Sequence, residues 1–435
     1  MERFVCEDLK NNMEAYFVCL PNTHSTVLSF YIRAGNKYED VQHIGASHLI
    51  EHLLFRRLHD IDQRQLYYEM ECMGTTLRAA TYSDFIRLYI EVLPRFTQRA
   101  FDLILKAMKG SCWSAQDVRK EKAVVINQIE KKWFSNNDYS KSVYWQGTPL
   151  CNLIMGNKSK VKGMSMKAIS HYYNLFFQPQ NCAFVLTGNF DSKTKECICQ
   201  ELGLMKNKNA PALPYSPLYP HNFCQRSAPD DCICDTDGNY ADVRICFEAN
   251  YNHVKREEVE YLHSILGDGV GSRLSFLMRE ELGLVDEIYT SFEPQNGFSI
   301  LSINYDVGYD KLLESLDYVF STIKSMKEHI SGRDIDASIQ FLTSNWEFSY
   351  DSPEALNFHY GWHSFVLDEP FEKPEVIADK FSNLTVSELQ TAARKLFSGK
   401  SMTSYVYCNK SKLKLSSIKK CLEKGRMELS QETFN

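Results

Sequence analysis

Two histidines and a glutamate fall within five residues of an otherwise apolar segment, Gly45–Phe55 (GASHLIEHLLF). Apolar residues recur there at helical spacing, which predicts a helix over about residues 44–58. Residues i and i+4 face the same way on a helix, so His48 and His52 can bind one ion from adjacent turns. Glu51 follows His48 by three residues and lies on the same side.

These residue types suit a catalytic zinc ion. Neutral imidazoles bind zinc, and an open coordination position lowers the pKa of a bound water. A neighbouring carboxylate can accept a proton as that water attacks a carbonyl. The His-x-x-Glu-His order is the inverted form of the common zinc-peptidase motif. A pair of core histidines that hydrogen-bond to Glu51 and to the backbone is the alternative, and the motif alone leaves both open.

Length and composition indicate a two-domain globular protein. The 435 residues exceed one compact domain, so two domains of about 200 residues each are expected. The chain is 44% hydrophobic and 24% charged, which is ordinary for a globular protein. A net charge of -6 argues against nucleic-acid binding. No run of 18 apolar residues occurs, so no membrane span is expected.

The sequence favours a cytoplasmic location. Its first twenty residues lack a basic region followed by an apolar core, so we expect no secretion signal. Fourteen cysteines are scattered along the chain and are expected to be reduced thiols. The pairs Cys197/Cys199 and Cys232/Cys234 lack the spacing of zinc knuckles, so no structural zinc is expected there.

The first half predicts a mixed α+β unit. Its expected strands and helices are residues 15–20, 25–33, the helix at 44–58, two strands after Gly74, helices at 96–109, 114–133 and 165–177, and a strand at 182–189. The helix from Ser114 begins with a capping box, in which Asp117 replaces the usual glutamate.

The second half partly repeats this order. Residues 206–231 are rich in Pro, Asn and Ser and are the expected linker between domains 1–205 and 232–435. After it come a strand at 241–249, helices at 256–266 and up to 281, strands around 298–305, further helices to about 397 and a strand at 402–407. A duplicated unit is therefore expected. The basic stretch from Lys410 is expected to be a solvated tail.

Five stretches of the chain resemble the pitrilysin–insulinase–mitochondrial processing peptidase family of zinc metallopeptidases. They are AGNKYEDVQHIGASHLIEHLLF (34–55), the strand pair after Gly74 ending ATYSDF, RKEKAVVINQI (119–129), QPQNCAFVLTGNF (178–190) and LGDGVGSRLSFLMREELGLV (266–285). They occur in the family's order and span most of the chain. The resemblance implies an α+β fold of two similar α/β-sandwich domains in tandem, which form a chamber around an unfolded peptide with a partner chain.

The resemblance also assigns roles to residues. It implies one zinc ion per chain with His48 and His52 as ligands and Glu51 as general base. It implies that an edge strand binds the substrate peptide by β-addition. The residues of that strand are Thr76, Leu77, Arg78, Ala79, Ala80 and Thr81. Arg279 matches an arginine that contacts substrate, where its permanent charge can stabilise an oxyanion.

The first departure from the family pattern concerns the third metal ligand. In the family this ligand is the later member of a Glu-x6-Glu pair; Glu121 matches the earlier member, and Gln128 occupies the later position. An amide oxygen can bind a cation but brings no charge, so zinc affinity should fall. Glu121 could compensate, by orienting a histidine or by reaching the metal itself. Glu130 is a weaker candidate, because it is rotated away from that face.

The second departure is Asp286, which stands where the family has a tyrosine. A tyrosine would donate a hydrogen bond to the tetrahedral intermediate, whereas an ionised aspartate would repel it. Tyr289 lies close by in the sequence and is a candidate to replace it.

Two functions from different classes remain. The first is a cytosolic zinc endopeptidase of peptides or short unfolded chains, working as a homodimer or as a heterodimer with a sister chain; maturation of a precursor peptide is one hypothesis within it. The second is a non-catalytic, substrate-binding subunit of such a heterodimer. A phosphate-binding loop at Gly267–Ser272 is not favoured, because its glycine spacing is wrong and no strand immediately precedes it.

Overall fold

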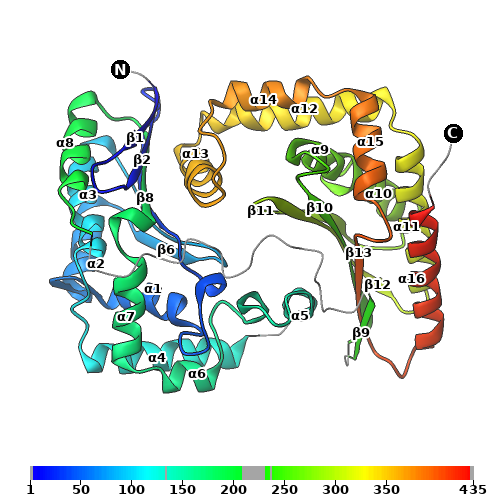
Figure 1. The fold of residues 1–435 in the computed structure, drawn as a ribbon, viewed down its shortest axis with the longest axis horizontal. Coiled ribbons are helices and arrows are strands. Elements are labelled where there is room, and N and C mark those ends of the chain that lie inside the picture. The colour runs from blue at the N-terminus through cyan, green and yellow to red at the C-terminus, as the bar shows by residue number, and fades with distance from the viewer. Residues whose placement is uncertain (1–2, 133–134, 208–230, 236–237, 432–435) are drawn as a thin grey trace. The chain divides into compact units, whose positions relative to one another are not determined.

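The computed structural model describes residues 3–132, 135–207, 231–235 and 238–431. The chain forms two compact units (Figure 1). They differ from the expected domains at two segments: residues 135–144 belong to the second unit, and residues 348–373 belong to the first. Of the expected linker, residues 208–230 lie outside the described residues.

The first unit is built on a six-stranded sheet with the order β1-β2-β8-β3-β7-β6. Its strands are β1 (Phe4–Asp8), β2 (Glu14–Cys19), β3 (Thr26–Ile32), β6 (Leu77–Thr81), β7 (Ile86–Val92) and β8 (Cys182–Gly188). Strands β2 and β8 are parallel, and the other neighbours are antiparallel. Every residue of β3 and β8 is buried, as expected for central strands covered on both faces.

Helices cover one face of this sheet. They are α1 (Ala46–Arg56), α2 (Gln63–Met73), α3 (Thr97–Leu105), α4 (Ala115–Lys131), α6 (Lys158–Gly163), α7 (Met166–Phe176) and α8 (Ser192–Gly203), with a two-stranded ribbon of β4 (Arg57–Leu58) and β5 (Ile61–Asp62) after α1. Their apolar sides pack with alternate strand residues such as Phe17, Phe30 and Phe184 in one core.

The opposite face of the sheet is covered by a segment from the second half of the sequence. Helix α13 (Pro353–His359) and the π-helix η8 (Tyr360–Val366) pack there on residues such as Tyr16 and Val185. Asn357 is fully buried, and its Nδ2 donates to the carbonyl oxygens of Val27 at 3.3 Å and Val185 at 3.1 Å. A buried amide needs such partners, so this segment belongs to the first unit.

The second unit has a five-stranded sheet with the order β11-β12-β10-β13-β9. Its strands are β9 (Asp231–Asp235), β10 (Tyr240–Asn250), β11 (Ile288–Gln295), β12 (Phe298–Gly308) and β13 (Met402–Cys408). The core on one face includes side chains of α9 (Arg256–Gly267), α10 (Arg273–Ser275), the π-helix η7 (Phe276–Glu281), α11 (Leu312–Glu328), α12 (Gly332–Ser349), α14 (Pro374–Ser382), α15 (Val386–Leu396) and α16 (Leu415–Ser430). Helix α5 (Asn136–Tyr144) also belongs to this unit, where Asn137 accepts a hydrogen bond from Arg244 of β10 at 2.7 Å.

The expected solvated tail after Lys410 is wrong, because most of it is helix α16. Ile418, Leu422 and Leu429 are buried in the second core. Gly425 lies so close to α11 that an added Cβ would be 2.4 Å from the ring of Phe320. The basic residues of this stretch therefore surround a packed apolar stripe.

The predicted fold class is confirmed: each unit combines one sheet with a layer of helices, giving two α+β units in tandem. Among the residues described, no helix is both long enough and apolar enough to cross a membrane.

Candidate active site

Helix α1 presents the three motif residues, and Glu39 fixes its beginning. The helix follows Gly45, whose φ of 87° favours glycine. Glu39 is almost fully buried and accepts hydrogen bonds from the backbone N–H groups of Gly45 at 2.7 Å and Ser47 at 2.9 Å. Burial raises the pKa of Glu39 to about 7. This cap was missed from the sequence, because Glu39 lies six residues before Gly45 rather than at the N-cap position.

The two histidine rings lie next to each other with their centroids 4.7 Å apart. His48 Nε2 lies 3.1 Å from Gln128 Oε1, and His48 Nδ1 lies 3.4 Å from Glu51 Oε2. Burial lowers the pKa of His48, but the contacts with Glu51 and Gln128 outweigh it and hold this pKa above its ordinary value. Burial raises the pKa of Glu51, but the contacts with His48 and Thr81 outweigh it and hold this pKa below its ordinary value.

Helix α4 places one side chain against each histidine. Its predicted capping box is present: Asp117 N donates to Ser114 Oγ at 3.1 Å, and Ser114 N donates to Asp117 Oδ2 at 2.8 Å. One turn after Asp117, Glu121 Oε2 lies 3.3 Å from His52 Nδ1. Gln128, two turns beyond Glu121, faces His48 as described above. Glu130 instead pairs with Lys158 at 2.5 Å, which keeps it from this cluster.

Glu121 is also bound by Arg56, a residue that sequence reasoning missed. Arg56 Nε donates to Glu121 Oε1 at 2.6 Å, and its Nη2 contacts the same oxygen. Arg56 Nη1 donates to Gln63 Oε1 at 2.8 Å. Burial raises the pKa of Glu121, but His52 and Arg56 outweigh it and keep that pKa below its ordinary value. The available signal was the spacing of Arg56, four residues after His52 on the same helix.

The residues present fit a zinc ion with a donor set poor in charge. In the part of the chain that the structure describes, no group of three His, Cys, Asp or Glu side chains is placed to hold one metal ion. The third possible donor beside the histidines is the amide oxygen of Gln128, while Glu121 contacts Arg56 and His52. Imidazole nitrogens and an amide oxygen are acceptable zinc donors, but together they are neutral.

Strand β6 lies beside this cluster. Among the described strands it pairs with β7 alone, from Leu77 opposite Ile90 to Thr81 opposite Ile86, so it is an edge strand. The expected strand 76–81 therefore begins one residue later than predicted. Thr81 Oγ1 donates to Glu51 Oε2 at 2.5 Å. The hydroxyl group of this edge strand thus holds the carboxylate of α1.

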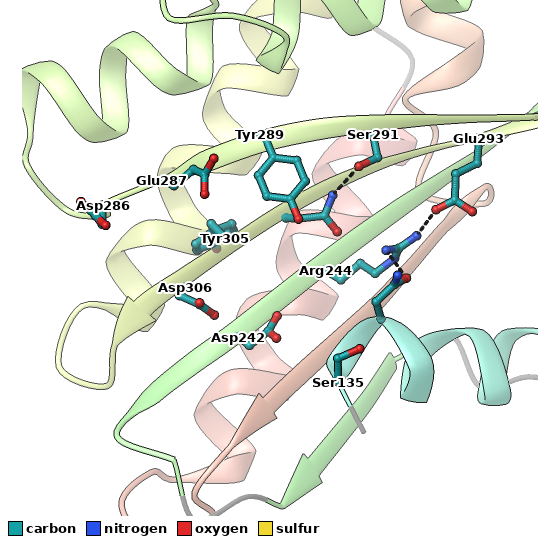
Figure 2. A pocket seen from close by; sticks show the side chains of 12 residues that line it. Ser135, Asp242, Arg244, Asp286, Glu287, Tyr289, Ser291, Glu293, Tyr305 and Asp306 are labelled. Atoms are coloured by element: carbon teal, nitrogen blue, oxygen red, sulfur yellow. Dashed lines mark hydrogen bonds and ion pairs between the residues drawn. The ribbon is translucent and has the colours of Figure 1, made fainter. Parts of the chain in front are cut away.

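The remaining predicted residues lie in the second unit. Arg279 is on the π-helix η7, half exposed, with its Nε 3.7 Å from Glu280. Asp286 and Tyr289 line a pocket of about 360 Å³ between β10, β11, β12 and α5. Figure 2 shows Asp286 just before β11, Tyr289 on that strand, and an interaction between Arg244 and Glu293. Arg244 Nη2 donates to Glu293 Oε1 at 2.7 Å.

The pocket is lined by several carboxylates. They are Asp242, Asp286, Glu287, Glu293 and Asp306. Burial and the nearby Glu287 raise the pKa of Asp306. The substrate contact that the resemblance implies for Arg279 stays a prediction, and so does the replacement of the family's tyrosine by Tyr289.

Family models match most of the chain. The model "Insulinase (Peptidase family M16)" matches residues 18–158, and "Peptidase M16 inactive domain" matches residues 163–342. The chain therefore belongs to peptidase family M16, as the resemblance indicated.

Known relatives are distant but match along the chain. An "Uncharacterized zinc protease" of Rickettsia bellii is 21% identical over 413 residues, covering 93% of this chain and 98% of that protein. Cytochrome b-c1 complex subunit 1 of Bos taurus is 23% identical over 167 residues, covering 38% and 35%. A protease structure from Helicobacter pylori shares the fold with a TM-score of 0.81 at 15% identity, covering 94% of this chain and all of that one.

Proposed function

We propose that this chain is a zinc-dependent endopeptidase that cleaves peptides or short unfolded chains. The observation that best supports it is the contact of the His48 and His52 rings, with the carboxylate of Glu51 beside them on the same helix. His48, His52 and the amide oxygen of Gln128 would hold the ion. When bound, zinc supplies a Lewis acid that lowers the pKa of water and polarises a carbonyl.

Side chains of the protein would accept and transfer the protons of the reaction. Glu51 would accept a proton from the attacking water and pass it to the amine nitrogen as the peptide bond breaks. The hydroxyl of Thr81 holds one oxygen of that carboxylate, which leaves the other free for the water. Glu121 would keep a hydrogen on His52 Nδ1 and so leave Nε2 for the ion.

The substrate would bind as an added strand on β6. The outer edge of β6 has no strand neighbour among those described, so its backbone groups can pair with an extended peptide over residues 76–81. Arg279 would contact substrate, the role that the resemblance implies for it. A single chain supplies half of a four-domain chamber, so we propose a homodimer or a heterodimer with a sister chain, with a precursor peptide as one candidate substrate.

A non-catalytic, substrate-binding subunit is the second candidate. It is favoured by Gln128, which removes the charge of the third ligand, and by Asp286 in place of the family's tyrosine. Similarity to a protein named as a cytochrome b-c1 complex subunit is compatible with it. The His-x-x-Glu-His motif, which is intact here, argues for the peptidase.

A Glu51→Gln variant separates the two candidates. Under the first, the purified wild-type protein binds zinc and cleaves unstructured peptides, alone or with a sister chain, while the variant retains zinc and loses cleavage. Metal analysis and a peptide-library assay measure the two properties. A wild-type protein that contains zinc in every assembly tested but cleaves no peptide would exclude the peptidase and leave the binding subunit.

We also propose a cytoplasmic location. Thirteen of the fourteen cysteines lie within the described residues, and none of these thirteen is in a disulfide. Reduced thiols in this number favour a reducing compartment.

A further inference from the structure

Arg56 contacts Glu121 and not the residues that would bind the metal, and it has no part in the function proposed above. It lies one turn after His52 on α1, and its side chain is about a quarter exposed, at 23%. Both guanidinium nitrogens that face Glu121 contact the same oxygen, Oε1. The other oxygen, Oε2, faces His52 Nδ1 at 3.3 Å. The two carboxylate oxygens thus have separate partners.

A second contact holds the arginine itself. Its Nη1 donates to Gln63 Oε1 at 2.8 Å, and Gln63 Nε2 donates to the hydroxyl of Tyr67 at 2.8 Å. A guanidinium can bind two acceptors at once in a rigid fork, which a lysine ammonium cannot do in the same geometry. The chain of contacts therefore runs from α2 through Arg56 to Glu121 and ends at the His52 ring.

Glu121 needs such a partner because its side chain is only 7% exposed. A buried carboxylate without a cation is costly, and one with a single anchor can rotate about its terminal torsion. The guanidinium neutralises the charge and fixes the plane of the carboxylate, so Oε2 stays on His52.

We propose that Arg56 is a positioning residue, which acts through Glu121 to hold the His52 ring in the orientation that binds the metal. The inference rests on the proposed zinc site and adds a residue to it. It predicts that loss of Arg56 weakens zinc binding without removing any ligand. It also predicts that replacing Arg56 has no further effect on zinc affinity once Glu121 has been replaced, because Glu121 then no longer binds both Arg56 and His52.

The test is a double-mutant cycle on zinc affinity, measured with a competing chelator. Arg56→Met should weaken zinc binding about 10- to 100-fold, the usual effect of losing a group that orients a ligand. In a Glu121→Gln background the same substitution should change the affinity less than about twofold. Arg56→Lys should recover only part of the affinity, since an ammonium can neutralise the charge of Glu121 but cannot bind Glu121 and Gln63 in the same fork geometry. The Co²⁺-loaded Arg56→Met protein should show an altered visible spectrum.

Arg99→Met is the matched control, because Arg99 also binds a carboxylate through Nε and Nη2, that of Glu69 on the exposed surface. It should leave zinc affinity unchanged. If Arg56→Met does not fold, Gln63→Leu removes the second anchor of Arg56 instead and should weaken zinc binding severalfold.

The outcomes separate this inference from the proposed function. An equal effect of Arg56→Met in both backgrounds, no effect, or tighter zinc binding would overturn the role of Arg56 while the zinc site stands. A wild-type protein that binds no zinc would overturn both.

Discussion

At the scale of residues, the charge at the proposed zinc site depends on one amide. Gln128 Oε1 lies 3.1 Å from His48 Nε2, as expected of a third ligand. Its amide group, however, brings no negative charge to the site. Glu121 does not supply the missing charge, because Arg56 balances it. Two imidazoles and an amide leave the double charge of zinc unbalanced, which predicts a loosely held ion.

Gln128→Glu should therefore tighten zinc binding by about tenfold or more, or about 1.4 kcal/mol. The substitution keeps the length of the side chain and adds a charged oxygen next to His48. Chelator competition measures the change. Asn127→Asp is the control, because it adds the same charge one residue earlier on an exposed part of α4. Unchanged or weaker binding in Gln128→Glu would show that this side chain is not a ligand.

At the scale of elements, the beginning of α1 matters as much as its motif. Glu39 binds two backbone N–H groups there, and a helix N-terminus has few other partners for them. The carboxyl nevertheless titrates near neutrality, because burial disfavours its charged form. Its pKa is raised from an ordinary value of 4.5 to about 7.

This shift makes a pH-dependent prediction. The folded protein binds the Glu39 proton more tightly than the unfolded chain, so the stabilisation is complete below pH 4.5 and is lost as the pH rises through about 7. The unfolding free energy of the wild type, relative to that of Glu39→Gln, should therefore fall by a few kcal/mol from pH 4.5 to 8. Urea unfolding of the metal-free proteins measures it. A difference that stays constant over this range would contradict the assignment.

At the scale of the whole molecule, the two units are not simply the parts of the chain before and after the Pro-, Asn- and Ser-rich residues 206–231. Residues 348–373 belong to the first unit although the second half of the sequence supplies them. Asn357 connects this segment to β3, β7 and β8, where its Oδ1 accepts from Arg87 at 3.0 Å in addition to the two bonds it donates.

Asn357→Leu should destabilise the first unit by about 3 kcal/mol or more, because it removes the buried side-chain bonds that Asn357 makes to two carbonyl groups and to Nη2 of Arg87. Thermal unfolding measures the loss. The matched control is Asn383→Leu, since Asn383 is exposed and bonds only within its own helical turn. Equal effects of the two substitutions would mean that the segment contributes little to the unit.

Local spacing explains which parts of the site were predictable. The contact between His48 and His52 follows from helical geometry alone, and so does the capping box at Ser114, because each depends on residues within one turn. The strands predicted at residues 15–20, 25–33 and 182–189 were also placed within one residue of their observed bounds. Helix α16 was missed because the stretch from Lys410 is rich in basic residues, so its composition resembled a solvated tail.

The sequence by itself determined the α+β class, the family, and a helix that carries two imidazoles and a carboxylate on one side. Only the tertiary structure decided that Glu121 faces His52 and Arg56 together, that Gln128 faces His48, and that residues 348–373 cover one face of the first sheet. The physical reason is distance along the chain. Helical and strand periodicity is set by neighbours a few residues away, whereas these contacts join residues 65 to 330 positions apart, and no local pattern encodes them.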